Sequence, residues 1–299
     1  LLRRERTNGG VGIVERLPTT GYRGAVGETV QPDPGVPGAF RVLVDGSSQA
    51  WVDPTDPLRL EFEYVQRITE VLDVTLLSRP AIERVRIVHL GGSAMMIPRW
   101  VEARRPHTAQ IVCEPDAETV ADVRRLIPLP RLSGIKIRET DGRSALRAMP
   151  DAYADAIVLD AFVGYEVPGE LATLEFFADI RRVLRRGGVF LANVVDHAPH
   201  PWVRRFIAGL PEIGTQIAAS AEAAIWKGRR FGNVVTIVSD RRFPMDVLIR
   251  RSASAPFPYQ WRYGRELVDM VGRATPFTDA DPQPSPTPSR RFRPFLGGA

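Results

Sequence analysis

From Val85 onward the chain alternates between short apolar runs and longer amphipathic segments. This alternation constrains the fold more than any other feature. Runs such as "AIVLD" and "VFLANVV" are apolar at consecutive positions, which is typical of strands buried on both faces of a parallel sheet. We therefore predict an α/β fold with a doubly wound, mostly parallel, Rossmann-like sheet. The expected strands are Val85–Leu90, Ala109–Glu114, Gly134–Glu139, Ala154–Asp160 and Gly188–Val194, and the expected helices are Ala94–Arg105, Ala117–Ile127, Arg143–Met149, Gly169–Leu184 and Trp202–Ala208.

Two hairpins are expected on either side of this core. Before it, the strand-like runs Phe40–Val44 and Gln49–Val52 flank Asp45-Gly46, a dipeptide that favours hairpin turns. After it, "AAIWKG" and "NVVTIVSD" predict an antiparallel hairpin, which brings the main sheet to seven strands. We expect a β-rich region with its following helix over 1–75 and a Rossmann-like domain over 76–272. The Pro-, Ser- and Thr-rich residues 273–299 predict a disordered or surface-wrapping tail.

Charge and composition bear on the class of partner. The net charge is +5 and the pI about 9.8, but the arginines are dispersed and form no basic stripe with aromatics, so we expect no nucleic-acid ligand. No apolar run reaches the roughly 18 residues of a membrane span, and the segment "LLRRERTNGG" lacks a signal-peptide core, so we expect a cytoplasmic protein. Cys113 is the single cysteine and the four histidines are scattered, so we expect no metal.

Polar residues and glycines follow the strands where ligands bind in such sheets, beyond their carboxyl ends. Gly91 and Gly92 follow the first strand and either let a ligand approach the backbone or form a plain tight turn. Glu114 ends the second strand, at the distance where an acid pairs with ribose hydroxyls; the alternative is a solvent-facing side chain. Asp116 is expected to be a helix N-cap that needs no ligand.

The next two strands also end near carboxylates. Asp141 follows the third strand and is either an acceptor for an adenine amino group or a cap for the following helix. Asp160 closes a fully apolar strand, and we favour a functional role for it over a turn cap. His89 precedes the glycines on an apolar strand, where a hydrogen-bonded core histidine is the expectation.

Taken in order, the Gly-Gly turn, Glu114, Asp141-Gly142 and Asp160 resemble a class I S-adenosylmethionine-dependent methyltransferase fold. Two N-terminal segments make the resemblance more specific. Asp45-Gly46-Ser47-Ser48-Gln49 and Glu61-Phe62-Glu63-Tyr64 are similar to the D-G-x-x-Q and E-F-x-Y segments of the spermidine synthase (polyamine aminopropyltransferase) family. The resemblance runs from about residue 40 to residue 240.

This resemblance implies roles for individual residues. It places Gln49 at the nucleoside, Glu114 at the ribose and Asp141-Gly142 at the adenine. It makes Asp160 the carboxylate that accepts the amine proton, and it puts Tyr64 at the amine site. It also implies decarboxylated S-adenosylmethionine as co-substrate, a small amine acceptor and a homodimer.

The chain departs from the family pattern at two carboxylates. The family turn is usually G-G-G-D-G, but Ser93 stands where the acid is expected. The second acid of the family's D-x-x-D segment falls on Val163. We therefore expect weak binding of a diamine, with Tyr165 and Glu166 as candidate replacements for the lost contacts.

Ser93 also leaves open whether the group donor is decarboxylated or intact S-adenosylmethionine. It would not repel the carboxylate of intact S-adenosylmethionine, so the cofactor-binding set (Gln49, Gly91, Gly92, Ser93, Glu114, Asp141 and Gly142) could accept either form. The alternatives to an aminopropyltransferase are a methyltransferase and a non-catalytic homologue of the fold.

Overall fold

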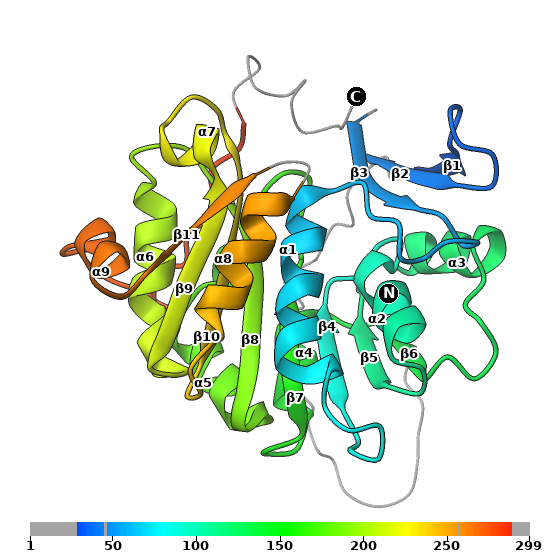
Figure 1. Ribbon diagram of the computed structural model, residues 1–299, viewed down its shortest axis with the longest axis horizontal. Coiled ribbons are helices and arrows are strands. Elements are labelled where there is room, and N and C mark those ends of the chain that lie inside the picture. The colour runs from blue at the N-terminus through cyan, green and yellow to red at the C-terminus, as the bar shows by residue number, and fades with distance from the viewer. Residues whose placement is uncertain (1–28, 45–46, 256–257, 289–299) are drawn as a thin grey trace, which may run out of the picture.

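The computed structural model describes residues 29–44, 47–255 and 258–288. A three-stranded antiparallel sheet of order β1-β2-β3 lies beside a large sheet that is flanked by helices (Figure 1). In the small sheet, β2 and β3 form the pair that the sequence predicts, and β1 pairs with the outer edge of β2. The proposed turn at Asp45-Gly46 lies outside the described residues. The bounds are Thr29–Pro32 for β1, Phe40–Val44 for β2 and Ser47–Val52 for β3.

The large sheet has eight strands among the described residues, in the order β11-β9-β10-β8-β7-β4-β5-β6. Its five first strands along the chain are all parallel to one another, as predicted. Strand order reverses between β4 and β7, which makes the sheet doubly wound and places a crevice at their carboxyl ends. The parallel strands are β4 (Arg86–Leu90), β5 (Ala109–Cys113), β6 (Ile135–Arg138), β7 (Ala154–Leu159) and β8 (Leu184–Asp196).

Three antiparallel strands extend the sheet beyond β8, and here two expectations were wrong. The segment "AAIWKG" does not supply the first hairpin strand: Ala223–Trp226 is a short helix, α7, and the strand lies just before it. The sheet also has eight strands and not the expected seven, because the aromatic segment "YQWRY" forms an additional edge strand. These strands are β9 (Gln216–Glu222), β10 (Gly232–Ser239) and β11 (Tyr259–Tyr263).

Helices cover both faces of the sheet (Figure 1). Helices α1 (Glu63–Leu72), α2 (Met96–Arg104) and α8 (Met245–Ser254) pack on one face in a shared apolar cluster. Helices α4 (Gly142–Arg147), α5 (Leu174–Val183) and α6 (Pro201–Gly209) pack on the other. The remaining elements are α3 (Ala117–Leu126), which packs under the small sheet, α9 (Gly264–Val271), the π-helical turn η1 (Asp73–Leu77), and the 3-10 turns η2 (Gly169–Leu171) and η3 (Leu210–Glu212).

The helix expected over Gly169–Leu184 is interrupted. The turn η2 ends before Thr173, whose hydroxyl accepts a hydrogen bond from the Phe176 amide as the N-cap of α5. A threonine at this position satisfies one of the first free N–H groups of a helix and so favours a new start.

The segment after α9 packs on the domain over its described part. Residues 273–288 form no regular helix. Phe277 is fully buried against Trp202, at 5.4 Å between ring centroids, and Ser285 is buried. The part of the expected tail over 289–299 lies outside the described residues.

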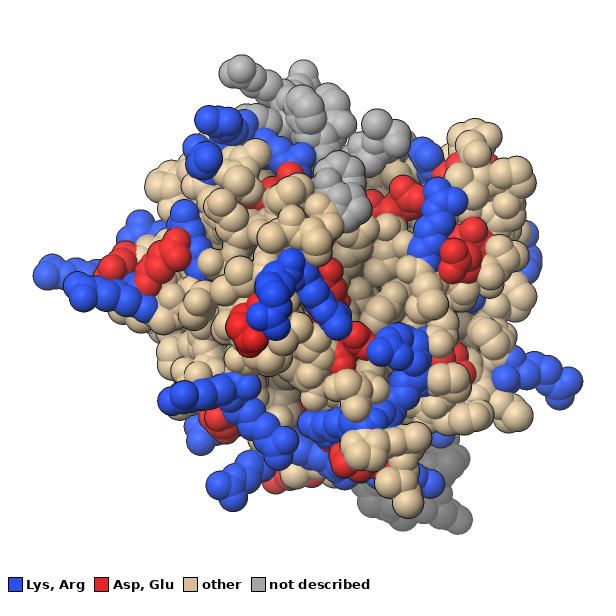
Figure 2. Space-filling model, viewed as in Figure 1, with Lys and Arg blue, Asp and Glu red and all other residues tan. Residues whose placement is uncertain are grey.

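Acidic and basic side chains are interspersed on the face in Figure 2. Many arginines there and elsewhere pair with acids, such as Arg205 with Asp281 and Arg251 with Asp73. Over the described ranges, no helix has the length and hydropathy that a membrane span requires, and no cluster of three or more His, Cys, Asp or Glu side chains has the arrangement of a metal site.

Candidate functional site

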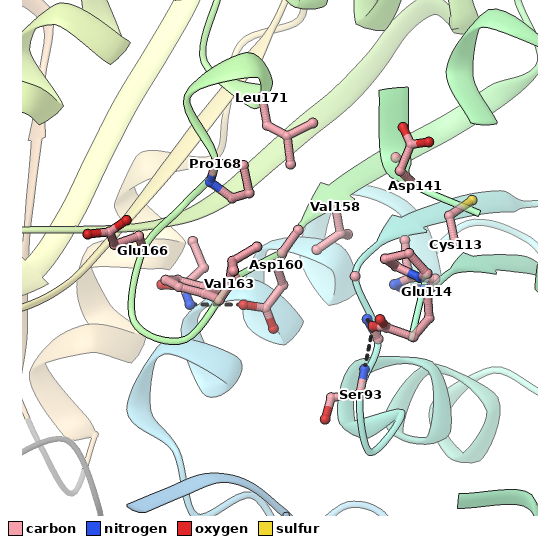
Figure 3. Close-up of a pocket in the computed structure, with 18 of the residues that line it drawn as sticks. Ser93, Cys113, Glu114, Asp141, Val158, Asp160, Val163, Glu166, Pro168 and Leu171 are labelled. Carbon is pink, nitrogen blue, oxygen red and sulfur yellow. Dashed lines mark hydrogen bonds between the residues drawn. The ribbon is translucent and has the colours of Figure 1, made fainter. Parts of the chain in front are cut away.

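A cavity of about 1050 Å³ opens at the carboxyl ends of the parallel strands. Its size is at the upper end of the range for small-molecule sites. Figure 3 shows part of its lining, with Ser93 and Glu114 on one side of Asp160 and Glu166 on the other. The structure brings every residue predicted for the site to this cavity: Gln49, Tyr64, Gly91, Gly92, Ser93, Glu114, Asp141, Gly142, Asp160, Tyr165 and Glu166.

The glycine turn after β4 is required by packing. Gly91 has φ +88°, and a Cβ there would lie 2.2 Å from the carbonyl oxygen of Asp160. A Cβ on Gly92 would lie 2.2 Å from Cγ1 of Val112. The two glycines therefore let the ends of β4, β5 and β7 approach one another, which brings Asp160 close to the turn.

Glu114 holds this turn from the end of β5. Its Oε2 accepts hydrogen bonds from the amides of Gly92, at 3.0 Å, and Ser93, at 3.1 Å (Figure 3). Its Oε1 accepts one from the Asp116 amide at 3.1 Å. The two turn amides thus bind a protein carboxylate. A carboxylate has about four acceptor positions, so Glu114 retains one for a hydroxyl group in the cavity.

Burial raises the pKa of Glu114, while the amide hydrogen bonds oppose the rise. The side chain is 8% exposed, so the solvent-facing alternative does not hold. A buried carboxylate with a spare acceptor position beside a glycine turn is suited to a ribose.

Asp116 and Asp141 are both helix caps. Asp116 accepts hydrogen bonds from the amides of Glu118 and Thr119 at the start of α3, as expected. Oδ1 of Asp141 accepts one from the Ser144 amide at 2.8 Å at the start of α4. Asp141 lines the cavity as well, so the cap does not prevent its second oxygen from contacting a ligand.

Several polar atoms at the cavity are buried without a hydrogen-bond partner in the described structure. They are Nε2 of Gln49, Nδ1 of His89, Oγ of Ser93, Nε of Arg143 and Oδ1 of Asn193. Buried polar atoms are normally hydrogen-bonded, so water or a ligand is the expected partner of these five. The set contains both donors and acceptors, which fits a nucleoside with hydroxyl, amino and ring-nitrogen groups.

Asp160 lies at the centre of the cavity wall, directly after β7. Its Oδ1 accepts a 2.9 Å hydrogen bond from Nδ2 of Asn193 (Figure 3), and the Tyr64 hydroxyl also hydrogen-bonds to it. Burial raises the pKa of Asp160 to about 6, and these two hydrogen bonds limit the rise. A carboxylate with this pKa is ionised near pH 7 and is a better proton acceptor than an exposed aspartate.

The loop after Asp160 forms a tight turn. The amide of Val163 donates to the Glu166 carbonyl at 2.9 Å, and the reverse bond is 3.2 Å. In such an antiparallel pair the two side chains emerge on the same face. Glu166 is therefore adjacent to Val163, although Figure 3 shows its carboxylate pointing away from that of Asp160.

The sequence reasoning missed Asn193 and the C-terminal segment. Asn193 is a polar residue within the apolar strand β8, and its place beside the end of β7 was the signal that could have found it. Asp279, Pro282 and Pro284 line the cavity although composition indicated a tail. His89 is a core residue, as expected: its Nε2 is 2.9 Å from Oε1 of Gln110, and burial lowers its pKa to about 4.

Comparison with known proteins finds related sequences and structures. No protein-family model matches the chain. The polyamine aminopropyltransferase of Chromobacterium violaceum is 27% identical over 159 residues, which are 52% of this chain and 58% of that protein. The matches to the curated relatives span 41% to 58% of those proteins' own length.

The solved structures cover more of the chain. A probable spermidine synthase from Corynebacterium glutamicum aligns with a TM-score of 0.78 and 27% identity, over 84% of this chain and 92% of that one. Human methyltransferase-like protein 13, solved in complex with SAH, aligns with a TM-score of 0.50 and 14% identity, over 72% of this chain and 95% of that one. The second likeness concerns the fold alone.

Proposed function

We propose that the chain is a distant member of the spermidine synthase (polyamine aminopropyltransferase) family with a methyltransferase-like fold. We propose further that it transfers an aminopropyl group from decarboxylated S-adenosylmethionine to an amine. The observation that carries the proposal is Asp160, at the centre of the cavity, with a raised pKa and hydrogen bonds from Asn193 and Tyr64. The unpartnered groups of Gln49 and Ser93, together with Glu114 and Asp141, support a nucleoside beside it.

In this reaction Asp160 is the general base. A primary ammonium has a pKa of about 10, so it must lose a proton before its nitrogen can attack. The Asp160 carboxylate takes that proton, and the nitrogen lone pair forms a bond to the aminopropyl carbon next to the sulfonium. The carbon–sulfur bond breaks, its electron pair stays on sulfur, and methylthioadenosine leaves as a neutral thioether. The sulfonium is a good leaving group, so orientation and deprotonation are the main tasks of the protein.

The acceptor site differs from that of a diamine enzyme. Ser93 and Val163 stand where the family has carboxylates, and each lost charge-assisted contact is worth roughly 1.5–3 kcal/mol. Two such losses weaken putrescine binding by about 10²–10⁴-fold. Tyr165 and Glu166 line the acceptor side, and Glu166 is the candidate for a replacement acid because it pairs with Val163 in the turn.

The second candidate function is methyl transfer from intact S-adenosylmethionine. Ser93 favours it, because its buried hydroxyl has no hydrogen-bond partner in the described structure and can donate to a ligand carboxylate. In that reaction the leaving group is S-adenosylhomocysteine.

A product assay separates the two reactions. Purified protein is incubated with each donor and a panel of mono-, di- and triamines, and the nucleoside product is identified by mass spectrometry. The proposal predicts methylthioadenosine and an aminopropylated amine from the decarboxylated donor. Production of S-adenosylhomocysteine and a methylated amine from the intact donor supports the second candidate instead. If neither nucleoside product forms with any amine, both candidates are contradicted.

A further inference from the structure

The C-terminal residues 276–288 lie against the cavity, on the side where Asp141 and Gly142 begin helix α4. Asp279, Pro282 and Pro284 line the cavity together with Arg143, Gly169 and Leu171. We propose that this segment, here called the strap, is a wall of the nucleoside half of the site, and that Asp279 determines nucleoside affinity through Arg143. The inference rests on the proposed function for the identity of the ligand.

Asp279 both lines the cavity and attaches the strap to the domain. Its carboxylate pairs with the Arg143 guanidinium and accepts a 2.7 Å hydrogen bond from the Thr173 hydroxyl. Its amide donates to Oε2 of Glu175 at 2.9 Å. Burial tends to raise the pKa of Asp279, but the bonds from Arg143 and Thr173 outweigh it and leave the pKa lowered. Asp279 is therefore ionised in the folded protein.

Arg143 connects the strap to the nucleoside side. It is the second residue of α4, follows the predicted adenine contacts Asp141 and Gly142 directly, and lines the cavity itself. Its guanidinium is fixed from two sides, by Asp279 and by the carbonyl of Glu170 at 3.1 Å. Only 13% of this side chain is exposed, so removal of Asp279 leaves a largely enclosed cation without its counter-charge.

Further contacts fix the strap to the loop that follows Asp160 and to helix α6. The Ser285 amide donates to the Val167 carbonyl at 3.0 Å, and the Val167 amide donates to the Ser285 hydroxyl at 2.8 Å. The Trp202 indole donates to the Gln283 carbonyl at 2.8 Å. A Cβ on Gly169 would lie 2.7 Å from backbone atoms of Gln283, so the two backbones are in direct contact.

The composition of the strap suits this role. Proline lacks an N–H group and restricts the backbone, so a proline-rich segment loses less conformational entropy when it packs and leaves fewer amides to satisfy. An ordered segment that lines a cavity gains contacts when a ligand fills the cavity. Ligand binding and strap packing therefore stabilise each other.

A matched pair of variants tests the inference. Asp279→Asn removes the charge that faces Arg143 and the cavity. Asp281→Asn removes the 3.0 Å ion pair with Arg205 from the same strap, at a residue that does not line the cavity. The dissociation constant for methylthioadenosine is measured by calorimetry on the full chain. We expect Asp279→Asn to raise it about threefold to tenfold, and Asp281→Asn to change it by less than about twofold.

Two further measurements use the same protein. Gly169→Ala pushes the strap away without altering its charges and should also raise the dissociation constant. In the unmodified chain, methylthioadenosine should slow hydrogen exchange at the amides of Asp279 and Ser285. If the unmodified chain binds methylthioadenosine but both Asp variants bind it equally well and the exchange is unchanged, the strap inference is overturned. If the unmodified chain does not bind methylthioadenosine, the proposed nucleoside site fails and the inference fails with it.

Discussion

Nδ2 of Asn193 on β8 donates a 2.9 Å hydrogen bond to Oδ1 of Asp160 at the end of β7. A hydrogen bond to the ionised form of a carboxyl lowers its pKa, and this one limits the rise that burial causes in Asp160. Asn193 therefore positions the Asp160 carboxyl, the proposed general base, and favours its ionised form near pH 7.

The pH profile of kcat/KM tests this relationship. Asp160 must be deprotonated to act as a base, so activity should fall as pH drops through about 6. Asn193→Ala removes one donor and should move this acidic limb to higher pH. Asn233→Ala is the control, because Asn233 lines the same cavity on the neighbouring strand β10. A limb that stays in place in Asn193→Ala would show that the hydrogen bond does not tune the base.

Asp160→Asn should stabilise the protein at high pH. Burial raises the pKa of Asp160 from 3.8 to about 6, so the folded state favours the protonated form. Protonated Asp160 therefore stabilises the folded state relative to the ionised form. This contribution to the folding free energy is fully present below pH 3.8 and is lost as pH rises through about 6. Above that range the ionised group costs roughly 3 kcal/mol of folding free energy, and asparagine avoids the cost. Thermal unfolding at pH 8 should give a higher Tm for Asp160→Asn, and the difference should shrink toward pH 4. A lower Tm for the variant at pH 8 would contradict the raised pKa.

Gly91→Ala should be strongly destabilising. The added Cβ would lie 2.2 Å from the carbonyl oxygen of Asp160, and the alanine backbone would have to adopt φ +88°. The matched control is Gly164→Ala, since Gly164 has φ +61° but nothing within 4 Å of its added Cβ. The control should cost about 1 kcal/mol from backbone conformation alone, and Gly91→Ala roughly 2 kcal/mol more from the clash. Equal losses in urea unfolding would mean that the turn does not depend on this contact.

Ser93→Asp should change the preference between the two donors. An acid at this position repels the carboxylate of intact S-adenosylmethionine and attracts the ammonium of the decarboxylated form. We expect the ratio of the two dissociation constants, measured by calorimetry, to shift by about tenfold or more toward the decarboxylated donor. Ser93→Ala removes the hydroxyl without adding charge and separates the two effects. An unchanged ratio in Ser93→Asp would place the donor's side chain away from this turn.

The sequence predicted the parallel core, and the gathering of the candidate site residues at one edge of it, because both depend on local patterns. Apolar runs such as Ala154–Leu159 mark buried parallel strands, and the carboxyl ends of such strands meet at one edge. Glu114, Asp141 and Asp160 could therefore be expected near one another from the sequence alone.

The parts that could not be predicted depend on contacts between distant residues. The helical turn Ala223–Trp226 is apolar like a strand, and its place between β9 and β10 decides its conformation. Residues 273–288 have the composition of a disordered segment, but Phe277 is buried against Trp202 and Arg205. Such burial depends on a surface that other parts of the chain create, and composition does not record it.

The most direct test of the account is a single-turnover experiment on Asp160→Asn. Enzyme in excess is mixed with decarboxylated S-adenosylmethionine and the preferred amine, and release of methylthioadenosine is followed at pH 8. We expect a rate at least about 10²-fold below that of the unmodified chain, with a dissociation constant for methylthioadenosine that stays within about twofold. A rate equal to that of the unmodified chain would contradict the assignment of Asp160 as the base that enables aminopropyl transfer.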